Sequence, residues 1–391
     1  MDEEARKPMQ KNTIFRIRSM TKPFIATATL MLVDEGKINL SDSVSKYLPS
    51  FNNEASVSVT IEQLLTHTGG FAQPGFPRDY ENYHSLREAA DDIGIIGPEF
   101  TPGTKYIYSD AGVAVLGAVI AEIVKMPVED YLELKILRPL EMTSTYFMLE
   151  ENQAIKDRIS GTYYRSGTDY VKYWDSSKPQ LVNYFRASGG IYSTPLDYAK
   201  FLYMWMNGGS INSRQYLSKQ SITRALTPGD LNNQYGYLWE LDQSFGHGGS
   251  DGTIGFVLPE KNLIVLYFTQ SRATYTTEVI KAMVLKEFGA EEFHQYTRVE
   301  VGADYFIPYT GKYKNSQVEL IVDSDDENLL VKTADSTNQL FFPSSAKDFF
   351  FHEILDIQLL FLRDSAEEVT GLLIYQRGEN IEVPKIKSIS K

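Results

Sequence analysis

The sequence has no cysteine among its 391 residues. Disulfide bonds, thiol catalysis and thiolate metal sites are therefore excluded, and cysteine usage leaves the cellular compartment undecided. Histidine is scarce as well. The five histidines, at positions 67, 84, 247, 294 and 352, are scattered and show no His-Glu-x-x-His spacing of a zinc hydrolase. We expect neither a metal nor any other cofactor.

The sequence also has fewer positive than negative residues and no long apolar segment. Lys and Arg total 38 against 51 Asp and Glu, a net charge of −13, so the overall field opposes binding to a phosphate backbone. The longest mostly apolar stretch, residues 111–124, falls short of the ~20 residues that a membrane-spanning helix needs and contains Glu122. We expect no nucleic-acid partner and no membrane span.

The first seven residues are acidic and polar, without the apolar core of a secretion signal. As numbered, the protein is predicted to be cytoplasmic. A periplasmic or secreted location would follow if an export signal had been removed before Met1.

The chain exceeds the ~250–300 residues at which a single core stops growing, so we expect two domains. Helical patterns cover residues 19–36, 61–66, 111–125, 195–206 and 276–288. Strand-like patterns cover residues 235–241, 253–258 and 263–269. From about residue 300, short alternating segments separated by polar turns predict a small antiparallel barrel or half-barrel.

The pattern Ser-x-x-Lys occurs four times, beginning at Ser19, Ser43, Ser344 and Ser388. Only Ser19 begins a long amphipathic helix, and i,i+3 spacing places Lys22 on the same face, within hydrogen-bonding range. A helix N-terminus also offers free N–H groups and positive potential to a developing oxyanion. The alternative role for Ser19 is that of a helix cap.

Five segments resemble, in order, the motifs of the serine β-lactamase and penicillin-binding-protein superfamily. They are most similar to the β-lactamase-like carboxylesterases called family VIII. The segments are Phe15–Pro23, Leu64–Gly70, Tyr108–Asp110 in the place of Tyr-x-Asn, Ser188–Thr194, and His247–Ser250 in the place of Lys-Thr-Gly. The C-terminal part, which opens with Tyr309–Tyr313, resembles the lipocalin-like domain appended to many such hydrolases.

This resemblance implies an α/β (α+β) fold. We expect a β-lactamase-like antiparallel sheet flanked by helices over residues 1–295, with a helical subdomain at about residues 41–190. A C-terminal antiparallel β-barrel-like domain would follow over residues 296–391.

The resemblance also implies the roles of individual residues. Ser19 would attack the substrate carbonyl, Lys22 would accept its proton, and Tyr108 would pass a proton to the leaving group. The backbone N–H groups of Ser19 and Ser250 would form the oxyanion hole. The glycines between His247 and Ser250 would let that strand approach the substrate; they are Gly248 and Gly249.

Two substitutions bear on the substrate. Asp110 stands where the family has Asn, and its carboxylate would repel the acid group of a β-lactam. His247 stands where the family has the lysine that grips this acid group. Both favour a carboxylesterase acting on small esters. A β-lactamase or a D-amino-acid peptidase or amidase is the alternative.

Only 18 residues precede Ser19, where the family has two sheet strands. An open sheet edge is a template for pairing. We therefore expect the edge to be covered by a partner chain in a homo-oligomer, by the C-terminal domain, or by residues 1–14.

Two further interpretations compete. Gly248–Gly252 fits the G-x-S-x-G nucleophile elbow of α/β-hydrolases, but the elbow must lead into a helix and a strand-like segment follows here. A protein that acylates without turnover, or one that only binds its ligand, belongs to a different class. The intact set of Ser19, Lys22 and Tyr108 favours an enzyme.

Overall fold

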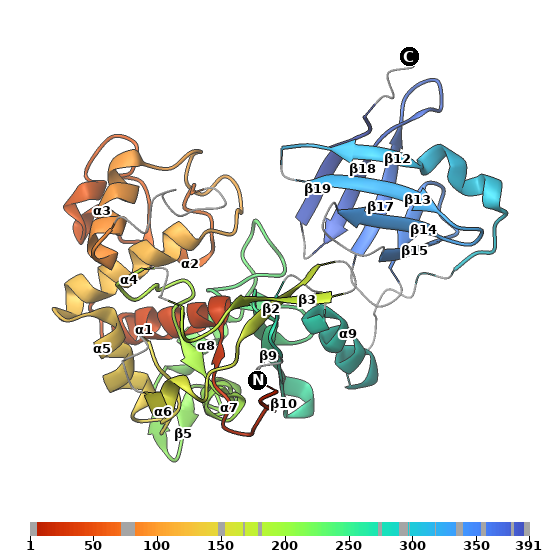
Figure 1. Ribbon diagram of the computed structural model, residues 1–391. Coiled ribbons are helices and arrows are strands. Elements are labelled where there is room, and N and C mark those ends of the chain that lie inside the picture. Colours follow the sequence, from red (N-terminus) through yellow and green to blue (C-terminus); the bar gives the residue numbers. More distant parts are fainter. Residues whose placement is uncertain are drawn as a thin grey trace. The chain divides into compact units, whose positions relative to one another are not determined.

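A computed structural model describes residues 6–71, 83–147, 153–166, 169–178, 182–272, 276–288, 296, 298–316, 318–333, 339–352, 357–376 and 379–386. The chain forms two compact units, residues 1–165 with 170–277, and residues 166–169 with 278–391 (Figure 1). The predicted domain boundary at residues 295/296 adjoins residues outside the described ones and stays a prediction.

The helices of the first unit are a 3-10 turn η1 (Arg18–Thr21), α1 (Lys22–Asp34), α2 (Ile61–Leu65), α3 (Leu86–Ile96), α4 (Asp110–Val124), α5 (Val128–Leu132) with the π-helical turn η5 (Glu133–Leu137), α6 (Gln153–Lys156), α7 (Pro195–Met206) and α8 (Lys219–Ala225). Side-chain caps start several of them. Thr60 and Gln63 form a reciprocal capping box at α2, and Thr194 caps α7, which has Pro195 at its first position.

The predicted helix over residues 19–36 differs from the structure at its beginning. Ser19 lies in η1, and the α-helix proper starts at Lys22. Pro23 lies in the first turn of α1 as expected, and Gly36, with φ of +68°, follows its end. The nucleophile candidate is therefore held in a tighter turn, just before the helix that carries Lys22.

The central sheet of the first unit is antiparallel and has the strand order β10-β9-β8-β7. Its strands are β7 (Glu240–Leu241), β8 (Phe245–Gly249), β9 (Thr253–Leu258) and β10 (Leu263–Phe268). A Cβ on Gly255 of β9 would lie 2.9 Å from the Tyr198 ring and 3.1 Å from Met20, so α7 and η1 pack closely on this sheet. This contact places the residue after Ser19 against the sheet face.

The strand predicted over residues 235–241 is wrong for its first five residues. The N–H of Gly236 donates to the carbonyl of Trp239 at 2.9 Å, and Leu238 has φ of +56°, so this segment is a turn. A Cβ on Gly236 would lie 2.1 Å from the carbonyl oxygen of Ala225. Close packing against the end of α8 therefore overrides the β-propensity of the aromatic residues.

Shorter pairings complete the first unit. β1 (Phe15–Arg16) pairs with β4 (Tyr192–Ser193), and β5 (Ser210–Ile211) pairs with β6 (Arg214–Gln215). A second sheet has the order β11-β2-β3, from β2 (Thr162–Ser166), β3 (Asp169–Trp174) and β11 (Ser271–Arg272). The last helix, α9 (Thr276–Phe288), has its predicted bounds and falls almost wholly in the second unit, where Val279 packs against that unit's core.

The second unit is one antiparallel sheet of eight strands in chain order. The strands are β12 (Gly311–Lys314), β13 (Glu319–Ser324), β14 (Leu329–Thr333), β15 (Gln339–Pro343), β16 (Phe349–Phe351), β17 (Ile357–Arg363), β18 (Val369–Gln376) and β19 (Glu379–Pro384), preceded by the 3-10 segment η7 (Ala303–Tyr309). The N–H of Ile386 donates to the carbonyl of Lys312 at 2.7 Å, so the sheet nearly closes on itself. The predicted barrel-like fold is confirmed.

Among the described residues, no single helix is long and apolar enough to cross a membrane. The bent pair formed by residues 110–124 and 128–137 passes the same length and composition test, with an angle of 75° between its parts.

Candidate active site

Ser19 and Lys22 lie next to each other, as their spacing predicts. The Nζ of Lys22 is 3.1 Å from the Oγ of Ser19. The Lys22 side chain is fully buried, whereas Ser19 is half-buried and open to a ligand. The other two Ser-x-x-Lys patterns that the structure describes, at Ser43 and Ser344, make no such contact.

In those patterns each lysine pairs with a carboxylate instead. Lys46, which follows Ser43, is an exposed residue that pairs with Asp42 at 2.9 Å. Lys347, which follows Ser344, pairs with Glu367 at 2.7 Å. The pattern that begins at Ser388 lies outside the described residues. The contact between hydroxyl and amine is therefore particular to the first pattern among those described.

Two further oxygens complete the surroundings of the Lys22 Nζ. They are the Oδ1 of Asp110 at 2.6 Å and the carbonyl oxygen of Ser188 at 3.0 Å. Burial lowers the pKa of Lys22, and the charge of Asp110 opposes this effect. Burial alone would raise the pKa of Asp110, but Lys22 and Arg186, at 3.6 Å, hold it below its ordinary value. The Lys22–Asp110 contact was not predicted.

Asp110 is the first residue of α4, and Ser109 caps that helix by accepting the N–H of Gly112 at 3.3 Å. Tyr108 precedes this cap, and its ring centroid lies 4.6 Å from the Lys22 Nζ. The three-residue motif therefore brings both an aromatic hydroxyl residue and a carboxylate to the same amine.

His67 and His247 meet the Tyr108 ring from two sides, with ring centroids at 4.6 Å and 6.1 Å. Tyr235 lies between the two histidines. Its hydroxyl is 3.2 Å from the Nε2 of His67 and 3.1 Å from the Nε2 of His247. Sequence reasoning missed Tyr235, for which the only signal was its place in an aromatic and glycine-containing run before the His247 motif.

The strand that carries His247 approaches η1 closely. A Cβ on Gly249 would lie 2.3 Å from the carbonyl oxygen of Ile17, so glycine is required there. A Cβ on Gly248 would meet nothing closer than 3.9 Å, so contacts within the described residues do not require that glycine. Ser250 is exposed directly after the strand. It lies in the turn between the antiparallel strands β8 and β9, not in a strand-to-helix elbow.

Asp251 joins this turn to the segment before Ser19. Its buried carboxylate is 2.7 Å from the Nε of Arg16, 2.9 Å from that of Arg18 and 2.5 Å from NH1 of Arg272. Burial alone would raise the pKa of Asp251, but the three arginines lower it. Arg18, the residue before Ser19, has φ of +50°, a strained value that this cluster helps to hold. The cluster was not predicted.

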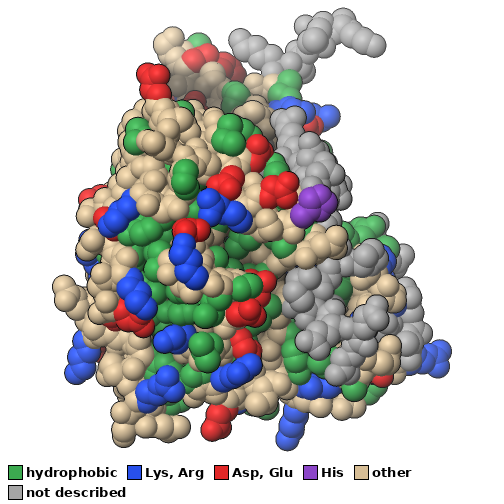
Figure 2. All heavy atoms as spheres, turned by 90° about the vertical axis from the view of Figure 1, so that its left-hand side faces the viewer, with side chains coloured by type: hydrophobic (Ala, Val, Ile, Leu, Met, Phe, Trp, Pro, Cys, Tyr) green, Lys and Arg blue, Asp and Glu red, His purple; other side chains and the backbone are tan. Residues whose placement is uncertain are grey.

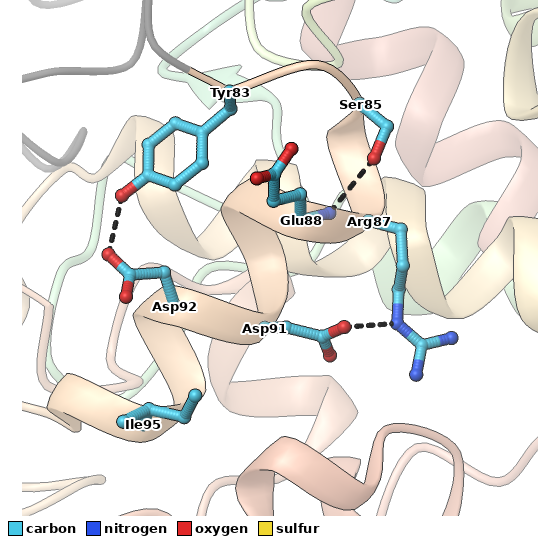
Figure 3. A pocket seen from close by; sticks show the side chains of 7 residues that line it. All are labelled: Tyr83, Ser85, Arg87, Glu88, Asp91, Asp92 and Ile95. Carbon is cyan, nitrogen blue, oxygen red and sulfur yellow. Dashed lines mark hydrogen bonds and ion pairs between the residues drawn. The ribbon is translucent and has the colours of Figure 1, made fainter.

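A surface hollow of 430 Å³ lies elsewhere, over α3 (Figure 3). In its lining, Arg87 pairs with Asp91 at 2.8 Å, and none of the lining residues belongs to the Ser19 cluster. Figure 2 shows that charged side chains of both signs are interspersed with apolar ones on one face of the molecule. No group of three or more His, Asp or Glu that could hold a metal occurs among the described residues.

Comparison with known proteins gives consistent results. Residues 1–289 match the family model described as Beta-lactamase. Protein Rv1367c of Mycobacterium tuberculosis is 30% identical over 249 residues, which are 56% of this chain and 61% of that protein. The chain therefore spans less than two thirds of this relative. Penicillin-binding protein 4* of Bacillus subtilis is 23% identical over 431 residues, covering 98% of this chain and 90% of the relative.

Solved structures share the fold. An octameric penicillin-binding protein homologue from Pyrococcus abyssi superimposes with a TM-score of 0.64 and 22% identity, covering 98% of this chain and 91% of that one. EstCE1, a hydrolase with promiscuous acyltransferase activity, gives a TM-score of 0.59 and 20% identity, covering 70% and 84%. The predicted fold class is confirmed.

Proposed function

Because the chain belongs to the beta-lactamase family, whose members include penicillin-binding proteins and are serine hydrolases, we propose that it forms an acyl-enzyme on Ser19 and acts as a carboxylesterase on small esters. One observation carries the proposal. The Oγ of Ser19 lies 3.1 Å from the amine of a fully buried lysine, Lys22.

The three neighbours of the Lys22 Nζ suit a general base. A protonated amine donates to Ser19, Asp110 and the carbonyl of Ser188 at once. A neutral amine still donates to Asp110 and Ser188, and its lone pair then faces the Ser19 hydroxyl, the only one of the three with a proton to give. Burial favours the neutral form.

The reaction follows from this arrangement. Lys22 takes the hydroxyl proton as the Ser19 oxygen bonds to the ester carbonyl carbon. The backbone N–H groups of Ser19 and Ser250 stabilise the resulting oxyanion. Tyr108 relays the proton from Lys22 to the alkoxy oxygen, the C–O bond breaks, and an alcohol leaves. Water then attacks the acyl-serine with the same groups as base, releasing the acid and restoring the Ser19 hydroxyl.

The preference for neutral esters rests on the two substituted positions. Asp110 is paired with Lys22 and lies 3.6 Å from Arg186. Its carboxylate is therefore already engaged with the proposed catalytic amine. His247 is 2% exposed and directs its Nε2 to Tyr235, so little of its ring is open to an acidic substrate. EstCE1, a hydrolase with promiscuous acyltransferase activity, has the same fold. Lactam or D-amino-acid peptide cleavage is the second candidate, favoured by the end-to-end likeness to penicillin-binding protein 4*.

A fluorophosphonate probe tests the proposed nucleophile. The probe should label the wild-type protein once, on the peptide that contains Ser19. The Ser19→Ala variant should not be labelled, whereas Ser250→Ala and Ser43→Ala should be labelled like the wild type. A tag on Ser250 would overturn the proposal. With a chromogenic ester, continued release of product identifies an enzyme, and release of a single equivalent identifies an acylating sensor.

We also propose self-association. β10 is the outermost strand of its sheet, its residues Leu263–Phe268 are half-buried and apolar, and no described strand pairs with its outer edge. The octameric homologue from Pyrococcus abyssi supports this proposal. Light scattering on dilute protein tests it, and a clean monomer would contradict it.

A further inference from the structure

Tyr235 is a buried residue, 5% exposed, in the turn before β7. Its hydroxyl lies between the Nε2 atoms of His67 and His247, at 3.2 Å and 3.1 Å. His67 follows α2 and packs its ring against that of Tyr108 at 4.6 Å, and His247 lies on β8. One hydroxyl therefore links two segments that both face the proposed nucleophile.

The outer partners of the two histidines determine the direction of each hydrogen bond. The Nδ1 of His67 accepts the backbone N–H of Ser109 at 3.3 Å, so its ring proton is on Nε2 and points to the Tyr235 oxygen. The Nδ1 of His247 lies 2.8 Å from the carbonyl oxygen of Gly248, which can only accept, so Nδ1 carries the proton there. The Nε2 of His247 is then an acceptor for the Tyr235 hydroxyl.

In one arrangement, each ring N–H and the hydroxyl proton of this row of hydrogen bonds has an acceptor. His67 donates to Tyr235, Tyr235 donates to His247, and His247 donates to a backbone carbonyl. If the Nε2 of His247 were protonated, two N–H groups would face the same hydroxyl oxygen, and the hydroxyl proton would lose its acceptor. Burial lowers the pKa of His67 well below 6.5 and raises that of Tyr235 well above 10, so both stay neutral.

Resting on the proposed function, we propose that Tyr235 is a positioning residue of the reaction, which acts by joining the His67 and His247 rings through its hydroxyl while their outer partners fix the tautomers. These joined rings hold β8 against the loop that carries Tyr108, whose ring packs on that of His67 at 4.6 Å. Tyr235 itself does not touch the reacting atoms. Its loss would let Tyr108 and β8 drift relative to Lys22.

The test compares Tyr235→Phe with Tyr237→Phe. Tyr237 is 4% exposed and lies two residues further on, but its hydroxyl binds Glu62 and Arg224, outside the proposed site. We expect Tyr235→Phe to lower kcat about tenfold with little change in KM, as loss of one buried hydrogen bond at a positioned group implies. Tyr237→Phe should keep the wild-type kcat. Equal kcat values for the two variants would overturn the proposal.

The ring tautomers give a readout that needs no activity. In ¹⁵N spectra of the wild-type histidine rings at pH 7, assigned with His67→Gln and His247→Gln, His67 should carry its proton on Nε2 and His247 on Nδ1. In Tyr235→Phe, the Nε2 signals of both rings should shift because each nitrogen loses its hydrogen bond to the hydroxyl, while the outer partners keep the tautomers. A charged His247, or one protonated on Nε2, would overturn the proposal. Probe labelling of Ser19 decides the proposed function separately.

Discussion

Each unit of the molecule pairs an aspartate with a cation, and the two pairs have opposite chemical character. In the first unit Lys22 lies 2.6 Å from Asp110. In the barrel-like unit Arg363 lies 2.7 Å from Asp348. A tyrosine lies beside each pair, Tyr108 near Lys22 and Tyr309 near Asp348. A carboxylate, a cation and a tyrosine are therefore not enough to define an active site.

In the barrel-like unit, the carboxylate of Asp348 is fully engaged by Arg363 and Tyr309. The Nε of Arg363 contacts both oxygens of Asp348 at 2.9 and 3.0 Å, and the hydroxyl of Tyr309 donates to Oδ1 at 2.8 Å. Arg363 and Tyr309 hold the pKa of Asp348 below 3.8 although burial alone would raise it, and the carboxylate raises the pKa of Arg363 further. No group in this cluster can act as a base near neutral pH. It ties η7 to β17 and to the turn before β16.

The Lys22 pair differs in the cation and in its third partner. A buried lysine can lose its proton near neutral pH, which an arginine cannot. One contact of the Lys22 amine goes to the hydroxyl of Ser19, a group that can be activated. The comparison teaches that the identity and burial of the cation, and what else it touches, separate a catalytic pair from a structural one.

Lys22→Met should have the largest effect. We expect activity to fall by ~10²–10⁴-fold, because the general base is lost. The fold should persist because Asp110 is partly exposed and remains near Arg186. Lys46→Met is the matched control, since Lys46 is also paired and belongs to another Ser-x-x-Lys pattern. Ester hydrolysis measured for both variants checks this, and equal activity would remove Lys22 from the mechanism.

Arg363→Met should affect stability instead of activity. Breaking a largely buried pair by removing one partner destabilises by about 3 kcal/mol, here in the barrel-like unit. Because the pKa of Asp348 is depressed, its stabilising contribution is present above pH 3.8 and is lost as the pH falls below that value. The variant should therefore differ least from wild type in acid. Urea unfolding at several pH values measures the difference, and a large loss of esterase activity in the folded variant would contradict the comparison.

Asp110→Asn should have an intermediate effect on the reaction. The carboxylate raises the pKa of Lys22, so its removal lets Lys22 lose its proton at lower pH. The acid limb of kcat/KM should move to lower pH by about one unit, and the plateau should fall by no more than about tenfold because the amide oxygen can still accept from Lys22. An acid limb that stays in place would show that Asp110 does not tune this amine. Asp348→Asn, in the other pair, should leave the profile unchanged.

Arg87→Ala should have the smallest effect. Arg87 pairs with Asp91 and Glu122 on the surface beside the hollow of Figure 3, and its side chain is 41% exposed. Exposed pairs contribute less than about 1 kcal/mol, so the thermal midpoint and kcat should stay near wild type. A marked loss of activity would mean that the hollow over α3 belongs to the site.

The contrast between local and distant features explains what could be predicted. The strands over residues 253–258 and 263–268 and the helix over 276–288 follow from local periodicity, and the structure has them within a residue. The segment before β7 did not follow its propensity, because packing of Gly236 against α8 decided its conformation. The sequence contained no strong signal for Tyr235.

The sequence by itself determined the contact between Ser19 and Lys22, because three residues along a helical turn are neighbours whatever the rest of the chain does. It also determined the order of the motifs and the alternating strands of the barrel. Only the tertiary structure decided which charges surround that amine. Asp110 is 88 residues from Lys22 in sequence, and Tyr235 is 168 residues from His67. Such pairs depend on how helices and sheet pack, and no local spacing encodes that packing.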